Sequence, residues 1–282
     1  MSREETTGIC LARKVAAAFS AAPGVEAVAL GGSQVSGCAG PDSDVDVYVY
    51  TTAAIPVHDR EGIVAQLGAV DPKFNPTPFW DVCDVWRDPS TGLRVEAIYW
   101  GTAWTQDMLD RVLVKHKAQN GYSTSHWYTI RNCLCLYDRS GWFAALQTRS
   151  RQPYPDQLRQ AITARNHPVL SAYRNQIAQA IRRGDLVSIN HRLAALLESY
   201  FDVLFAFNRA LHPGEKRLLD LAARHCPKTP ANMPAQVAKA LRSASSTGED
   251  LLAAIDDLIT GLDCLLLDEG IGNSTSARKT AP

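Results

Sequence analysis

Two aspartates stand two residues apart in Asp44-Val45-Asp46, at the start of a stretch in which every second residue up to Tyr50 is valine. Successive side chains of a β-strand point to opposite faces, so both carboxylates lie on one face, about 7 Å apart along the strand. Neighbouring carboxylates repel each other unless a cation neutralises them, and hard oxygen ligands suit Mg²⁺. The spacing therefore predicts that Asp44 and Asp46 hold magnesium jointly.

A glycine-rich turn, Gly31-Gly32-Ser33, precedes this strand and follows the apolar run Val25–Leu30. Because glycine lacks a Cβ, the backbone N–H groups of the turn can approach an anion closely, and Ser33 adds a hydroxyl donor. The segment is neither a P-loop nor a dinucleotide fingerprint, since it contains no G-K-[ST] and no G-x-G-x-x-G. A phosphate-binding turn beside a strand with two acids favours metal-assisted phosphoryl or nucleotidyl transfer.

The order Gly32-Ser33, then about ten residues, then Asp44-Val45-Asp46 resembles the signature of the nucleotidyltransferase superfamily. This superfamily includes DNA polymerase β and the aminoglycoside adenylyltransferases. The segment Leu136–Gly141 is similar to the strand and turn that close the domain in antibiotic-modifying members of the aminoglycoside and lincosamide types. The resemblance covers residues 10–150.

The resemblance implies a mechanism and a set of site residues. It assigns two Mg²⁺ ions, which bridge a nucleoside triphosphate, to Asp44 and Asp46, and it assigns the phosphates to Gly32 and Ser33. A third carboxylate comes from a later strand and either completes the metal site or takes a proton from the acceptor hydroxyl. Glu96, which stands between apolar neighbours in the segment 93–100, matches that position.

Glu96 has alternatives in this sequence. On a half-buried hairpin its carboxylate would pair with Arg87 or Arg94. Three further acids near the segment are alternatives to Glu96 as the third carboxylate: Asp42, Asp81 and Asp84. Of these, Asp42 in Pro41-Asp42-Ser43 is more typical of a turn before the strand.

The chain departs from the superfamily pattern after the Gly-Ser turn. Many members carry an arginine there, whereas this chain has Gln34. The missing positive charge would come from the C-terminal half, where Lys216 follows Pro213-Gly214 near the start of a helix. We therefore assign Lys216 to nucleotide binding; the alternative is a solvated cation in the first helical turn.

The elements around these residues predict an α+β protein, with a mixed sheet and flanking helices followed by an all-α bundle. In the first half, helices are expected at 9–20 and 107–117, and strands at 25–30, 44–50, 81–87, 93–100 and 132–137. In the second half, helices are expected at 155–165, 168–183, 186–211, 214–225, 234–243 and 249–267. We predict a nucleotidyltransferase catalytic domain at 1–150, a helical bundle domain at 151–270 and a disordered tail at 271–282, with the active site between the two domains.

The composition narrows the class of protein. With 46% hydrophobic and 21% charged residues, the chain is neither collagen-like, nor a disulfide scaffold, nor wholly disordered. It has 29 basic and 29 acidic residues, and this zero net charge argues against a nucleic-acid partner, although residues 151–247 are net basic. The seven cysteines lack C-x-x-C spacing and are expected to be reduced. Since no signal sequence or membrane-spanning apolar run is found, we expect a cytoplasmic protein with no membrane partner.

Together with these patterns, the resemblance to the nucleotidyltransferase superfamily implies an adenylyltransferase-like enzyme. It would transfer a nucleoside monophosphate, AMP from ATP in the first instance, to a hydroxyl of a small molecule such as an antibiotic, and release pyrophosphate. Its partners would be the nucleoside triphosphate and the hydroxyl acceptor, and two Mg²⁺ ions its cofactors. Two alternatives remain: a protein or tRNA acceptor, as in toxin–antitoxin relatives, and a nucleotide-binding module without turnover.

Overall fold

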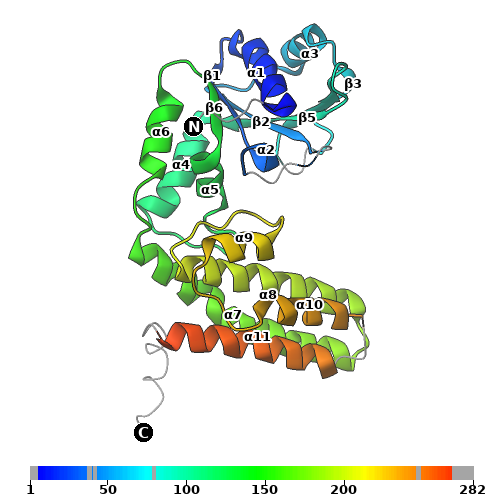
Figure 1. The fold of residues 1–282 in the computed structure, drawn as a ribbon, viewed down its shortest axis with the longest axis vertical. Coiled ribbons are helices and arrows are strands. Elements are labelled where there is room, and N and C mark those ends of the chain that lie inside the picture. The colour runs from blue at the N-terminus through cyan, green and yellow to red at the C-terminus, as the bar shows by residue number, and fades with distance from the viewer. Residues whose placement is uncertain (1–5, 37–39, 41–42, 78–80, 246–248, 269–282) are drawn as a thin grey trace. The chain divides into compact units, whose positions relative to one another are not determined.

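The computed structural model describes residues 6–36, 40, 43–77, 81–245 and 249–268 of the chain (Figure 1). The chain divides into two compact units. Unit 1 comprises Met1–Asp110 and His126–Pro153, and unit 2 comprises Arg111–Ser125 and Tyr154–Pro282. Each unit has a hydrophobic core of its own.

Unit 1 is built on a six-stranded sheet with the order β3-β4-β5-β2-β1-β6. The strands are β1 (Val25–Leu30), β2 (Val45–Thr51), β3 (Val70–Phe74), β4 (Cys83–Arg87), β5 (Arg94–Gly101) and β6 (Leu134–Asp138). Strands β2 and β5 pair in parallel, and the other neighbours pair antiparallel. This mixed sheet, followed by helices in the second half of the chain, confirms the predicted α+β class.

One face of the sheet carries the core of unit 1. Alternation along β2 places Val45, Val47 and Val49 on this face, where they are fully buried. Helix α1 (Thr7–Ser20) covers them with an apolar stripe, and its first turn is capped by the Thr6 hydroxyl, which accepts from the Ile9 N–H. Helix α3 (Val57–Gln66) adds to the same core (Figure 1).

The opposite face of the sheet has an aromatic part. Tyr50 of β2 packs against Phe143, with the ring centroids 4.8 Å apart, and Trp100 of β5 packs against Trp104 and His126. These partners come from α4 (Thr102–Leu113), α5 (Ser125–Asn132) and α6 (Trp142–Ser150). The helices thus cover the carboxyl ends of the parallel strands β2 and β5 and leave their amino ends, where Asp44, Asp46 and Glu96 stand, for the site.

Local patterns in the sequence do not predict several elements of unit 1: β3, the short α2 (Gly32–Ser36), α3, α5 and α6. Strand β3 is an exposed edge strand that contains Pro72 and therefore lacks the alternation of a half-buried strand. The two helices α3 and α6 are short and weakly amphipathic.

Unit 2 is helical. Its helices are α7 (Asp156–Arg182), α8 (Leu186–Phe207), α9 (Leu218–His225), α10 (Met233–Ser243) and α11 (Glu249–Asp268). The two helices expected at 155–165 and 168–183 form the single helix α7, with Pro168 inside it. An internal proline costs about 3 kcal/mol, and burial of the stripe that includes Leu158, Ile162 and Leu170 outweighs that cost.

A buried polar network joins the segment 111–125 to the helices of unit 2. The carboxylate of Asp202 on α8 accepts from the Ser123 backbone N–H at 3.0 Å and from its hydroxyl at 2.6 Å. Asn166 on α7 accepts from the Gly121 N–H at 3.0 Å and donates to Asp202 at 3.1 Å. Burial raises the pKa of Asp202 to about 7, although both bonds from Ser123 oppose this shift.

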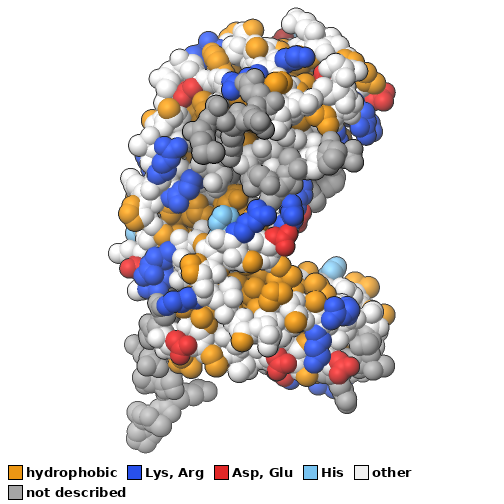
Figure 2. Space-filling model, viewed as in Figure 1, with side chains coloured by type: hydrophobic (Ala, Val, Ile, Leu, Met, Phe, Trp, Pro, Cys, Tyr) orange, Lys and Arg blue, Asp and Glu red, His pale blue; other side chains and the backbone are white. Residues whose placement is uncertain are grey.

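Unit 2 also contains a small apolar cavity of about 290 Å³ among α8, α9 and α10, where Figure 2 shows hydrophobic side chains gathered at the surface. None of the six described cysteines forms a disulfide. Over the described ranges, no helix has both the length and the apolar character needed to cross a bilayer. The tail predicted at 271–282 lies outside the described residues.

Candidate active site

The glycine turn and the first acidic strand meet at the end of β1. The Gly31 N–H donates to the Asp46 carbonyl at 2.9 Å, which fixes the turn against β2. Gly32 has φ +62°, in the left-handed region that glycine tolerates best, and a Cβ on it would overlap the Asp46 carboxylate. The Asp46 carboxylate therefore lies against the backbone of the Gly32-Ser33 turn, so the structure brings together the predicted phosphate-binding turn and one predicted metal ligand.

Gln34 has a structural position in the turn. Its side-chain amide donates to the Ser43 carbonyl at 3.3 Å, immediately before Asp44. It also packs under Gly8 of α1, where a Cβ would overlap the Gln34 carboxamide. Gln34 thus connects α1, the glycine turn and the start of β2, and it positions the turn. It does not supply the positive charge of the arginine that many members of the nucleotidyltransferase superfamily carry after this turn.

Glu96 stands beside Asp46 across the parallel pair of strands. Asp46 and Glu96 are register partners on β2 and β5, and both side chains lie on the face opposite the valine core. Asp44 directly precedes β2 on the same face, two residues before Asp46. The three predicted carboxylates therefore share one face at the amino ends of two adjacent strands.

Arg94 pairs with two of these carboxylates. One guanidinium nitrogen, Nη1, donates to Asp44 Oδ2 at 3.3 Å, and Nη2 lies 3.7 Å from Glu96 Oε2. The Glu96 side chain is 28% exposed, against 41% for Asp44 and 44% for Arg94, so the group is open to solvent on one side. The expected alternative, in which Glu96 pairs with an arginine, is realised here with Arg94, which neutralises part of the acidic charge.

The donor set bears on a divalent metal. Carboxylate oxygens from Asp44, Asp46 and Glu96 are the ligand chemistry that Mg²⁺ prefers, and they are gathered on one sheet face. In the described part of the chain, no group of three or more acidic, histidine or cysteine side chains is spaced to hold a metal ion as it stands. The residue types fit a magnesium site, and in this structure Arg94 pairs with two of the three carboxylates, those of Asp44 and Glu96.

The three acids that were alternatives to Glu96 differ in their position relative to Asp46. Asp84 lies on the core face of the sheet, where it is 1% exposed and forms a 2.6 Å ion pair with Arg60, and the Tyr99 hydroxyl donates to it at 2.8 Å. It therefore faces away from Asp46. Asp81 is close enough for its charge to contribute to the raised pKa of Tyr48, together with those of Asp46 and Glu96. Asp42 lies outside the described residues.

Tyr48 lies on the same face as Asp46 and packs against Trp100, although the sequence patterns did not assign Tyr48 to the site. Their ring centroids are 4.6 Å apart, and a Cβ on Gly31 would overlap the Tyr48 ring. Burial raises the pKa of Tyr48, so its phenol stays protonated. Burial also raises the pKa of Cys133, which makes it a thiol and a poor nucleophile. The alternation that places Tyr48 on the face of Asp46 was a signal in the sequence.

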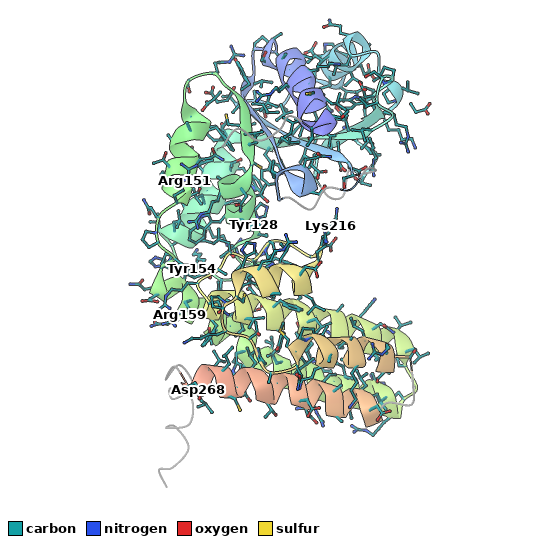
Figure 3. The ribbon with its side chains drawn as sticks, in the orientation of Figure 1. Tyr128, Arg151, Tyr154, Arg159, Lys216 and Asp268 are labelled. Atoms are coloured by element: carbon teal, nitrogen blue, oxygen red, sulfur yellow. The ribbon has the colours of Figure 1, made fainter. Side chains whose placement is uncertain are left out.

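Lys216, the predicted phosphate ligand of the C-terminal half, belongs to unit 2. It stands in the segment between α8 and α9, and its exposed side chain projects away from the helices of its own unit (Figure 3). Its role in nucleotide binding stays a prediction.

Comparison with known proteins adds two family matches. Residues 12–69 match the model of the nucleotidyltransferase domain, and this range contains Gly32, Ser33, Asp44 and Asp46. Residues 122–218 match a domain of unknown function, DUF4037. The prediction of a nucleotidyltransferase is confirmed by the first match.

Similarity to whole chains is weaker. A crystal structure of a nucleotidyltransferase-like protein from Exiguobacterium sibiricum 255-15 is similar at 14% identity with a TM-score of 0.44, over 92% of this chain and 75% of that one. A search of the curated proteins found no match.

Proposed function

We propose that the protein transfers a nucleoside monophosphate, AMP from ATP in the first instance, to a hydroxyl group of a small molecule. The acceptor oxygen forms a bond to the α-phosphorus while the bond from that phosphorus to the β-phosphate bridging oxygen breaks, so that pyrophosphate leaves. The proton of the acceptor hydroxyl passes to a base. An antibiotic with a free hydroxyl is one such acceptor.

One observation carries this proposal: the Asp46 carboxylate lies against the left-handed Gly32 turn, with Glu96 as its register partner on the neighbouring strand. A turn whose backbone can approach phosphates and a pair of acids that can bind cations are the two components that nucleotidyl transfer needs side by side. Both components lie in unit 1, and the turn and the aspartates fall within the matched nucleotidyltransferase range.

Each residue has a role in the proposal. Asp44 and Asp46 would hold two Mg²⁺ ions, with Glu96 as a third ligand or as the base that takes the acceptor proton. When bound, the ions would neutralise phosphate charge and stabilise the attacking and leaving oxygens. Gly32 and Ser33 orient the triphosphate through backbone and hydroxyl donors. The assignment of Lys216 to nucleotide binding stays a prediction.

Labelled ATP tests the proposal. The protein is mixed with Mg²⁺, ATP labelled at the α-phosphate, and separate pools of hydroxylated small molecules, tRNA or protein. We expect the label in the small-molecule pool with release of pyrophosphate, and loss of both in Asp46→Asn. Glu61→Gln, which changes an exposed carboxylate on α3 to an amide, is the matched control and keeps full activity. Label in the tRNA or protein pool would replace the acceptor class, and pyrophosphate release by Asp46→Asn at the wild-type rate would refute the site.

A nucleotide-binding module without turnover is the second candidate. The observation that favours it is the Arg94 guanidinium, which pairs with both Asp44 and Glu96 where a catalytic cation would lie. A thermal-shift titration with Mg²⁺ and ATP separates the candidates. Nucleotide binding that depends on Mg²⁺, with no pyrophosphate released over a broad acceptor panel, would favour the module.

A further inference from the structure

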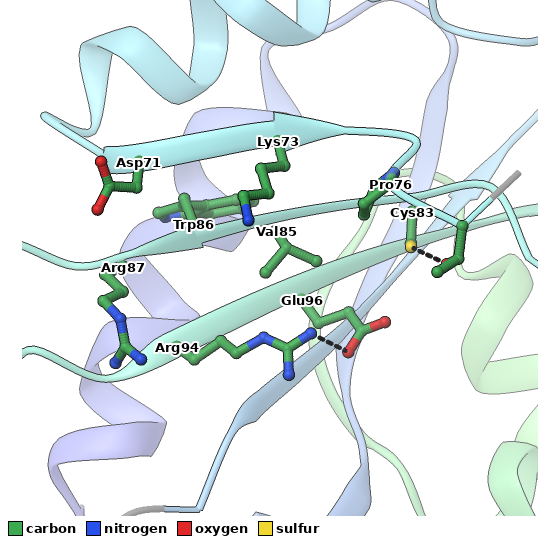
Figure 4. Close-up of a pocket in the computed structure, with 10 residues that line it drawn as sticks. Asp71, Lys73, Pro76, Cys83, Val85, Trp86, Arg87, Arg94 and Glu96 are labelled. Carbon is green, nitrogen blue, oxygen red and sulfur yellow. Dashed lines mark hydrogen bonds and ion pairs between the residues drawn. The ribbon is translucent and has the colours of Figure 1, made fainter.

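A cavity of about 520 Å³ lies beside Glu96, above strands β3, β4 and β5 (Figure 4). All its lining residues belong to unit 1, and three of them are basic: Lys73, Arg87 and Arg94. A volume of this order is typical of sites for small molecules. The cavity and the Gly32 turn lie to opposite sides of the carboxylates, since β5 pairs with β4 on one side and with β2 on the other.

The register of the sheet sets the dimensions of this cavity. Lys73 on β3 is the partner of Val85 on β4, which is the partner of Glu96 on β5, and Glu96 is the partner of Asp46. Two strand spacings separate the backbones of Lys73 and Glu96, a distance of about 10 Å. A ligand across this row would have one end at Glu96, its middle over the apolar Val85 and its far end at Lys73.

Two acids, Asp71 and Glu96, line the cavity together with the three basic side chains, so basic charge exceeds acidic charge in the lining by one. Arg87 and Arg94 are direct partners on the antiparallel strands β4 and β5, an arrangement of like charges that destabilises a sheet. Arg94 has Asp44 and Glu96 as counter-ions, whereas the Arg87 guanidinium donates to the Gly92 carbonyl at 3.1 Å. Over the described ranges, neither Lys73 nor Arg87 forms an ion pair.

Protection of a sheet edge explains only part of this pattern. Lysine on an edge strand prevents pairing with other chains, and β3 is the edge of the sheet, which accounts for Lys73. Strand β4 is paired on both sides, so edge protection does not account for Arg87 opposite Arg94. An anion between these side chains would remove their repulsion and supply the acceptor for several charged donors.

We propose that this cavity binds the acceptor, and that the acceptor is a small hydroxyl compound that carries a phosphoryl group. Lys73 and Arg87 bind the phosphoryl group, and the reacting hydroxyl lies about 10 Å away at Glu96. The inference rests on the proposed function, because it identifies Glu96 as the reacting end. It also disfavours polycationic acceptors such as aminoglycosides, which Lys73, Arg87 and Arg94 would repel.

Inorganic phosphate is the probe for the first test. It is titrated calorimetrically into the full chain after the nucleotide site has been saturated with Mg²⁺ and a non-hydrolysable ATP analogue. We expect binding to the wild type, and binding weaker by about tenfold or more in the double variant Lys73→Gln/Arg87→Gln, since each lost contact is a charged hydrogen bond. The double variant Lys14→Gln/Arg151→Gln removes one lysine and one arginine charge from exposed positions of the same unit and should bind like the wild type.

Phosphate that fails to bind the wild type, or binds both double variants equally, overturns the proposal. Two competitors extend the test. Neomycin, a polycation, should leave phosphate binding unchanged, and binding of neomycin in place of phosphate contradicts an anionic acceptor. A tRNA mixture that displaces phosphate at far lower concentration than glucose 6-phosphate does would assign the cavity to a nucleic-acid end instead.

The same variants separate this inference from the proposed function. Asp46→Asn should lose binding of the Mg²⁺–nucleotide analogue and retain the phosphate binding of the cavity. Lys73→Gln/Arg87→Gln should retain binding of the Mg²⁺–nucleotide analogue and lose the phosphate binding. If the wild type binds no nucleotide, the proposed function fails and the phosphate result stands by itself. If nucleotide binds and phosphate does not, the acceptor inference alone fails.

Discussion

Replacement of Gly32 by alanine tests the contact between the glycine turn and Asp46. Gly32 has φ +62°, and a Cβ there would overlap the Asp46 carboxylate. The change therefore has two effects in one substitution. It places an L-residue in the left-handed region, and it forces the carboxylate or the turn to move.

The backbone effect lowers the stability of the protein, whereas the steric effect lowers the rate of the reaction. The backbone effect is about 1 to 2 kcal/mol of stability, as for any non-glycine residue in that region. The steric effect requires a shift of roughly 1 Å at the site, and a displacement of that size can reduce the rate of an enzyme by about 100-fold. Gly141 separates the two effects, because it has φ +81° and a Cβ there would meet no atom of the described residues within 4 Å.

The assay measures melting temperature and pyrophosphate release for Gly32→Ala and Gly141→Ala. Both variants should lose a similar few degrees of melting temperature, about 2 to 4 °C for each kcal/mol in a chain of this size. Only Gly32→Ala should lose activity, by about 100-fold. If Gly32→Ala keeps activity within a few-fold of Gly141→Ala, the Asp46 carboxylate does not act where the structure places it.

Three further predictions concern charges. Arg60→Leu should destabilise unit 1 by about 3 kcal/mol or more in urea unfolding, because it leaves the buried Asp84 carboxylate unpaired, and Arg60→Leu/Asp84→Leu should recover most of this loss. Arg94→Gln should tighten Mn²⁺ binding, measured by electron paramagnetic resonance, because the guanidinium competes for Asp44 and Glu96; weaker binding would contradict that competition. Asp202 and His212 are two buried groups whose pKa shifts affect stability in opposite directions. The pKa of Asp202 is raised to about 7 in the folded protein, so its contribution to stability is lost as the pH rises from about 4 to 7. The pKa of His212 is lowered to about 3, so its contribution to stability is lost as the pH falls below about 6.5. Asp202→Asn should therefore make the melting temperature fall more steeply on acidification than in the wild type. An unchanged pH profile would show that Asp202 does not offset the effect of His212 on stability.

The sequence predicted the parts of the fold that local patterns determine. The alternation of valine along β2 indicated the strand and also the face on which Asp44 and Asp46 stand, and the hairpin of β4 and β5 followed from its turn residues. It did not predict β3, whose residues are exposed and include Pro72. It divided α7 at Pro168, because local rules do not include the packing of α7 against α8.

Local patterns in the sequence also predicted only part of the candidate site. Period-two spacing along the chain places Asp46 and Tyr48 together, but only strand pairing places Glu96 beside Asp46 and Arg94 near Asp44. The opposition of Arg87 and Arg94 likewise depends on register, which the sequence alone does not define. The roles of Asp44, Asp46, Glu96, Gly32, Ser33 and Lys216 stay predictions until variants are measured.

We propose that Asp44, Asp46 and Glu96 bind a divalent cation together with a nucleotide at the Gly32 turn. Titration of Mn²⁺ into the protein with a non-hydrolysable ATP analogue, followed by electron paramagnetic resonance, tests it most directly. We predict nucleotide-dependent Mn²⁺ binding by the wild type and its loss in Asp46→Asn. Equal Mn²⁺ binding by both proteins, or none by the wild type, would contradict it.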